Sequence, residues 1–129
     1  MALNDSLSNA LSHITNCEKA RKNECIIKPS STLIKKVLQI MKDNGYIKEF
    51  NEYQGRGNYI KTNLLGKINK CGSIKPRFSV KSNEIEKYEK RYLLAKDFGI
   101  IILSTNRGLM THHEAKEKGF GGRLISYIY

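Results

Sequence analysis

The sequence has 129 residues and a formal net charge of +11, because 23 Lys and Arg residues stand against 12 Asp and Glu residues. Hydrophobic residues make up 40% of it, enough for one compact domain or two small packed ones, which argues against wholesale disorder. No apolar run approaches the roughly 18 residues of a membrane span, and the first residues lack a secretory signal, so we expect an intracellular protein whose partner is a polyanion.

The three cysteines, Cys17, Cys25 and Cys71, are odd in number and widely spaced. Their spacing fits neither an even disulfide framework nor the CxxC pairs of a structural zinc site. We therefore expect reduced, mostly buried thiols, and we predict no cofactor and no metal site.

The first half of the chain predicts an α-β-α-β-β unit over residues 1–68. Apolar residues recur at helical spacing from Leu3 to Ile14, and the basic turn 19–23 follows. A short strand over 25–27 precedes a helix that Ser30 or Ser31 caps and Gly45 closes. Strand-like segments then occupy 46–53 and 59–65, joined by the glycine-containing loop 54–58.

The second half predicts a mostly β subdomain with short helices over residues 69–129. It follows the loosely patterned basic connection 66–72. The expected elements are a strand over 74–81 in which Pro76 favours an edge position, a helix from Asn83 to about 96, and a buried strand over 99–103. Thr111 and Glu114 then form a capping-box signature for a helix ending at Gly119, and a last strand covers 123–129. The expected fold class is α/β (α+β), with two small packed subdomains.

The basic charge is concentrated in one stretch. No acidic residue lies between Tyr53 and Asn83, whereas seven cations do: Arg56, Lys61, Lys67, Lys70, Lys75, Arg77 and Lys81. Crowded cations repel one another, and a partner that supplies phosphates relieves the repulsion. The alternative is a solvated basic face that aids solubility.

A compact polar segment follows the predicted buried strand. It reads Ser104-Thr105-Asn106-Arg107-Gly108, and its hydroxyl and amide groups can both donate to and accept from an RNA, while Gly108 lets an RNA backbone approach. The alternative is a polar turn whose side chains cap its own backbone. The glycines of 119–122 favour a tight connection, and the motif of a phosphate-binding loop is missing.

His112, His113 and Glu114 suggest a metal or acid–base cluster at first sight. Adjacent helical histidines should point about 100° apart, and the i to i+4 spacing of HExxH is missing, so we predict neither a metal nor a catalytic residue here. Cys71 lies in a basic stretch that could lower its pKa, but a lone thiol without a paired base is weak evidence for a nucleophile.

The block from Ser104 to Thr111, continuing through Glu114-Ala115 to Gly121-Gly122, resembles the signature of the universal small-subunit ribosomal protein eight family, S-T-S-x-G-x-M followed by E-A and G-G. The resemblance extends end to end, including 16–22, 45–50 and 66–78. The helical segment 85–99 is similar to archaeal and eukaryotic cytosolic members. Asn106 replaces the usual third signature Ser, and Arg123 stands where bacterial members often carry Glu.

The resemblance implies a two-subdomain α/β fold, binding to the central domain of small-subunit rRNA, and a structural role in subunit assembly without catalysis. Neighbouring small-subunit proteins are further expected partners, in the cytoplasm, with assembly in the nucleolus if the source is eukaryotic. Alternatives are a free RNA-binding regulator outside the ribosome and, more weakly, a metal-dependent hydrolase. The expected rRNA-binding residues are Arg21, Lys22, Ser31, Arg56, Lys67, Lys70, Lys75, Arg77, Ser104, Thr105, Asn106, Arg107, Gly108, Gly121, Gly122 and Arg123.

Overall fold

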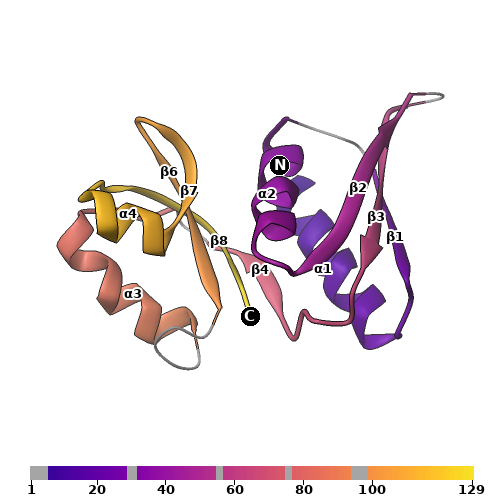
Figure 1. Ribbon diagram of the computed structural model, residues 1–129, viewed down its shortest axis with the longest axis horizontal. Coiled ribbons are helices and arrows are strands. Elements are labelled where there is room, and N and C mark those ends of the chain that lie inside the picture. Colours follow the sequence, from indigo (N-terminus) through magenta and orange to yellow (C-terminus); the bar gives the residue numbers. More distant parts are fainter. Residues whose placement is uncertain (1–5, 29–31, 55–56, 75–76, 94–98) are drawn as a thin grey trace. The chain divides into compact units, whose positions relative to one another are not determined.

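The structure is a computed structural model that describes residues 6–28, 32–54, 57–74, 77–93 and 99–129 (Figure 1). The chain divides into two compact units, Met1–Cys71 and Gly72–Tyr129. Helices and two antiparallel sheets make it a mixed α+β protein, which confirms the predicted fold class. Within the described ranges, no helix is both long enough and apolar enough to cross a membrane.

The first unit has the predicted α-β-α-β-β order. Its elements are α1 (Ser6–Lys19), β1 (Glu24–Ile27), α2 (Thr32–Asp43), β2 (Ile47–Tyr53) and β3 (Tyr59–Leu64). The strands form an antiparallel sheet in the order β1-β3-β2. Every second residue of β3 is buried, as a sheet with one covered face requires. Helix α1 packs on β1 and α2 on β2, so the core lies between the helices and this face.

Helix α1 ends at Lys19, where the predicted basic turn 19–23 begins. The apolar face continues into its last turn, because Cys17 falls on the same face as Leu7, Leu11 and Ile14 and is buried with them. Gly45 ends the turn after α2 with a φ of +80°, a conformation that glycine adopts without strain. The predicted cap at Ser30 or Ser31 lies outside the described residues.

The second unit is built around an antiparallel sheet in which strands distant in the sequence lie side by side. Its elements are β4 (Cys71–Ser73), β5 (Ser79–Val80), the 3₁₀ turn η1 (Ser82–Glu84), α3 (Ile85–Tyr92), β6 (Ile100–Thr105), β7 (Gly108–Thr111), α4 (His112–Lys118) and β8 (Gly122–Ile128). The strand order is β4-β8-β6-β7, with β5 also pairing with β8. The core cluster joins apolar residues of the sheet and both helices: Ile74, Val80, Ile85, Leu93, Ile101, Leu103, Met110, Ala115 and Leu124.

The prediction of a single strand over 74–81 is wrong. Within that range only Ser79–Val80 forms a strand, β5, while β4 precedes the range at Cys71–Ser73, and both strands lie along β8. The segment still bonds to β8 between them, because Ile74 N–H donates to the Ile125 carbonyl and Leu124 N–H donates to the Phe78 carbonyl. Pro76 lies outside the described residues.

The third helix also differs from its prediction at both ends. It ends at Tyr92 rather than near 96, because Leu93 takes an extended conformation. Asn83 is not its cap: it lies inside η1, which begins where the Lys81 N–H donates to the Glu84 carboxylate over 3.1 Å. Thr111, in contrast, caps α4 as predicted by accepting from the Glu114 N–H, and Gly119 ends that helix with a left-handed conformation.

Candidate RNA-binding surface

Three polar side chains form a row across three strands of the second unit. Ser79 of β5 lies directly opposite Arg123 of β8, and Arg123 lies directly opposite Ser104 of β6. Directly opposed residues of antiparallel strands point to the same face. All three side chains are exposed, so the sheet presents a guanidinium flanked by two hydroxyls.

This row opens into a hollow of about 360 Å³. Residues from three separate parts of the sequence line it: Ser79, Val80, Ser104, Thr105, Asn106, Gly121, Gly122 and Arg123. Six of these are among the predicted rRNA-binding residues, and the strand register brings the six to one place. Ser79 and Val80 were missed, because only the pairing of β5 with β8 reveals their position.

The polar segment after Ser104 is a tight hairpin, not a turn that follows the strand. Strand β6 runs through Thr105, only Asn106 and Arg107 form the turn, and Gly108 begins β7 with a φ of +103°. The short strand β7 was not predicted, because the polar signature around it favoured a turn. Asn106 and Arg107 are therefore held at an exposed hairpin tip.

Thr105 and Ser104 have different roles in this hairpin. The Thr105 hydroxyl donates to the Gly108 carbonyl over 2.9 Å and accepts from the Arg107 N–H over 3.1 Å. The Thr105 hydroxyl therefore stabilises the turn, as in the alternative that the side chains of this segment cap its own backbone. The Ser104 hydroxyl is exposed and has no hydrogen-bond partner among the described residues, which leaves it available to a ligand.

Gly121 and Gly122 serve close backbone approach. A Cβ on Gly122 would come under 3.0 Å from the carbonyl oxygen of Ser104, and one on Gly121 would meet the Val80 carbonyl oxygen at 2.5 Å. Both neighbours are backbone atoms that cannot rotate away. These glycines therefore let β8 enter the sheet between β5 and β6 and so create the hollow.

A second, basic hollow of about 630 Å³ lies in the first unit. Lys19, Arg21 and Lys22 line one part of it, and residues 64–66, 68 and 69 line another. Arg21 has a φ of +57°, so the chain turns sharply there and exposes consecutive cations. The predicted Arg21 and Lys22 thus share a concave surface with residues that flank the exposed Lys67 and Lys70.

The other predicted cations belong to the stretch of the sequence without acidic residues. Lys67, Lys70, Arg77 and Lys81 are exposed, and none has an acidic partner among the residues described. Lys61 is the exception, since its ammonium lies 3.3 Å from the Glu24 carboxylate. Ser31, Arg56 and Lys75 lie outside the described residues.

The histidine pair does not form an exposed acid–base cluster. His112 is fully buried, its Nδ1 accepts from the Ile101 N–H over 3.0 Å, and its Nε2 lies 3.6 Å from the Glu89 carboxylate. His113 is exposed. The centroids of the two rings lie 3.9 Å apart, although adjacent helical side chains were expected to point in different directions. His112 therefore joins β6 to α3 from inside the unit.

Cys71 is also a structural residue. Burial raises the pKa of its thiol to about 11, opposite to the lowering considered from the basic sequence around it. Its Sγ donates to the Leu11 carbonyl over 3.3 Å and lies 3.2 Å from the Thr15 hydroxyl. The three cysteines are free and buried, as predicted.

One family model matches the chain over residues 5–129, and its description is ribosomal protein S8. The match includes both units and every residue of the hollow lined by Ser104 and Arg123. The chain therefore belongs to the ribosomal protein S8 family, whose members are structural, rRNA-binding components of the ribosome and not enzymes.

Proposed function

We propose that the chain is a component of the small ribosomal subunit, of the archaeal and eukaryotic cytosolic type and close to the eukaryotic protein fifteen-A. In this proposal it binds the central domain of small-subunit rRNA and supports subunit assembly in the cytoplasm, or first in the nucleolus of a eukaryote. The observation that carries the proposal is the hollow in which Ser104, Thr105, Asn106, Gly121, Gly122 and Arg123 converge. The hydrolase alternative is dropped, because the family is structural and His112 is buried.

Recognition and attraction are assigned to different residues. The row of Ser79, Arg123 and Ser104 has a geometry that suits an RNA backbone and exposed base edges: a central cation for phosphate and two hydroxyls that donate and accept. A-form RNA hides its major groove, so such a surface reads bases where pairing is irregular. Arg56, Lys67, Lys70, Lys75 and Arg77, together with Arg21, Lys22 and Ser31, supply contacts to phosphates.

The hairpin tip adds the contacts of Arg107 and Asn106 in this assignment. Because Thr105 fixes the turn through two hydrogen bonds, the two tip residues are presented in one geometry before RNA arrives. Such preorganisation lowers the entropy that binding must overcome.

Single substitutions should separate attraction from recognition. Lys70→Ala should lower the slope of log affinity against log salt by about one, because one fewer phosphate is neutralised. Ser104→Ala should leave the slope unchanged and weaken binding by about fivefold, the effect of one lost hydrogen bond. Filter-binding titrations over a range of salt concentrations, with a transcript of the rRNA central domain from the same organism, measure both quantities.

Matched controls test the assignment. Lys42, at the end of α2, and Ser12, on α1, are exposed residues outside the two hollows, so Lys42→Ala and Ser12→Ala should bind like the unsubstituted protein. A transcript in which the irregular pairs are replaced by Watson–Crick pairs should erase the difference between Ser104→Ala and the parent. An equal salt slope in Lys70→Ala and Lys42→Ala would contradict the division.

The free regulator differs from the ribosomal role in its sedimentation. In a sucrose gradient of cell lysate at moderate salt, we expect the protein to migrate with small subunits and with the smaller particles that precede them. A chain confined to the light fractions, whatever the subunit yield, would favour a regulator outside the ribosome.

A further inference from the structure

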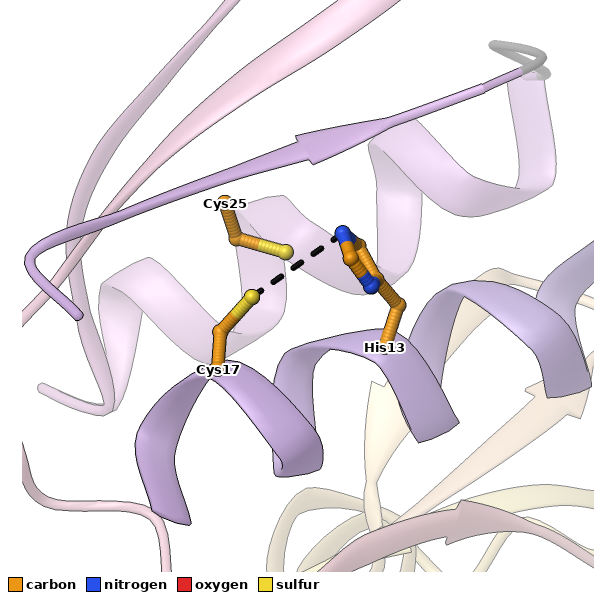
Figure 2. A group of neighbouring side chains, drawn as sticks. All are labelled: His13, Cys17 and Cys25. Carbon is orange, nitrogen blue, oxygen red and sulfur yellow. Dashed lines mark hydrogen bonds between the residues drawn. The ribbon is translucent and has the colours of Figure 1, made fainter. Parts of the chain in front are cut away.

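His13, Cys17 and Cys25 meet in the first unit, and none of them lines either hollow described above. Figure 2 shows His13 and Cys17 one turn apart on α1 and Cys25 reaching toward them from β1. The helical spacing of i and i+4 places the first two on one face. The alternation of β1, exposed then buried, turns Cys25 toward that helix.

From this juxtaposition we propose that His13, Cys17 and Cys25 bind one Zn²⁺ ion, with water as the fourth ligand. The Cys17 sulfur lies 3.9 Å from His13 Nε2, and the three ligand atoms all lie within 4.8 Å of one another. A tetrahedral zinc ion with bonds of its usual length separates such atoms by about 3.4 to 3.8 Å. Side-chain adjustments of less than about 1 Å therefore complete the site.

The chemistry of the ligands selects the ion. Two thiolates and one imidazole suit zinc, whereas calcium and magnesium require oxygen ligands. The thiols are buried at 4% and 2% exposure, while His13 is exposed, so the cluster has a protected side and a side that faces solvent. On the exposed side an ion can reach the ligands from solvent, and a water molecule can bind there as the fourth ligand.

The third cysteine shows what a purely structural thiol looks like in the same unit. Cys71 directs its sulfur to the Leu11 carbonyl and the Thr15 hydroxyl, which are ordinary hydrogen-bond partners. Cys17, in contrast, has a histidine nitrogen beside its sulfur, and Cys25 lies next to it. The sequence concealed this cluster, since seven residues separate Cys17 from Cys25 and no CxxC spacing marks it.

Binding replaces protons with the ion. The S–H bonds of Cys17 and Cys25 break as two Zn–S bonds form, both protons pass to solvent, and His13 supplies the lone pair of Nε2. Burial, together with the neighbouring Cys17 and Cys71, raises the pKa of Cys25, and Lys22 acts in the opposite direction. Zinc affinity should therefore rise with pH, because binding releases protons.

The test uses the full chain, reduced and freed of metal by a chelator that is then removed. Co²⁺ serves as the coloured probe, and Zn²⁺ displaces it in competition. We expect one Co²⁺ per chain with a thiolate-to-cobalt charge-transfer absorption. Cys17→Ser, Cys25→Ser and His13→Gln should each weaken Zn²⁺ binding at least about 100-fold, more than changes outside the metal's direct ligands usually do.

Cys71→Ser is the matched control, because it removes a buried thiol of the same unit that is not in the cluster. It should bind Co²⁺ and Zn²⁺ like the parent. His13→Gln decides the outcome if a cysteine variant fails to fold, because His13 is exposed, and far-UV circular dichroism shows whether the fold is kept. A spectrum without a thiolate band, or equal Zn²⁺ affinity in His13→Gln and the parent, would overturn the proposal.

Discussion

Gly122→Ala should destabilise the second unit by about 2 to 3 kcal/mol, the cost of forcing an extra methyl group into a closely packed position. The new Cβ would come under 3.0 Å from the carbonyl oxygen of Ser104 and press on its carbonyl carbon as well. Both atoms belong to the β6 backbone, so the strands must separate where Arg123 meets Ser104. RNA affinity should decrease as well, because the contact between β6 and β8 forms the hollow that Ser104 and Arg123 line.

Gly72→Ala is the matched control for this substitution. Gly72 is in the same unit and has no positive φ, and the nearest atoms to a Cβ there would be ring atoms of Tyr127 at 3.0 Å or more rather than backbone atoms. Hydrogen exchange of the β6 and β8 amides should accelerate strongly in Gly122→Ala and little in Gly72→Ala. Similar exchange rates in the two variants would show that the approach of β8 to β6 tolerates a methyl group.

Acid should destabilise the second unit through His112. Burial is the main cause that lowers the pKa of His112 from 6.5 to about 4; the charges of His113 and Lys116 act in the same direction, and Glu89 opposes them. The folded unit therefore binds fewer protons than the unfolded chain between these pH values. The contribution of neutral His112 to the free energy of unfolding is fully present above pH 6.5. It decreases as the pH falls toward 4, by up to about 3 kcal/mol.

The geometry explains why the ring must stay neutral. Nδ1 accepts from the Ile101 N–H, and a protonated ring would place two hydrogens against each other. Glu89, on α3, is itself held by Lys116 of α4, so its charge is already partly neutralised.

His112→Asn isolates this contribution, since an amide oxygen can still accept from Ile101 but does not titrate. Urea unfolding in the presence of a chelator, from pH 7 to 4.5, should show a much flatter pH dependence for His112→Asn than for the parent. The exposed neighbour provides the control, and His113→Gln should retain the steep dependence. A parent protein whose stability is constant over that range would contradict the buried, neutral His112.

Most regular elements of this chain could be predicted from local signals. The helical spacing of Leu7, Leu11 and Ile14 and the Thr111 cap identify α1 and α4, because each depends on residues within a few positions of one another. Predictions failed where distant residues decide the outcome. Strand β7 is four residues long and is defined by pairing with β6, and the segment between β4 and β5 is organised by its bonds to β8.

The sites followed the same rule. Ser104 and Arg123 were predicted from the sequence as rRNA-binding residues, whereas Ser79 joins their row only through the register of β5 on β8. Thr105 is a predicted RNA contact, and the structure adds a second role, because its hydroxyl holds the hairpin through hydrogen bonds to Gly108 and Arg107. The His13, Cys17 and Cys25 cluster required both a helical spacing and a strand facing it, which composition and cysteine counting do not reveal.

The position of β8 in the second sheet sets the order of events during synthesis. Strand β8 is the last element along the sequence, yet it pairs with β4, β5 and β6. A nascent chain whose residues 122–128 have not left the ribosome cannot assemble the row of Ser79, Arg123 and Ser104. The basic turn 19–23 of the first unit leaves the ribosome earlier and can contact phosphates first. A growing chain would therefore gain affinity for RNA in general before it can distinguish one RNA structure from another.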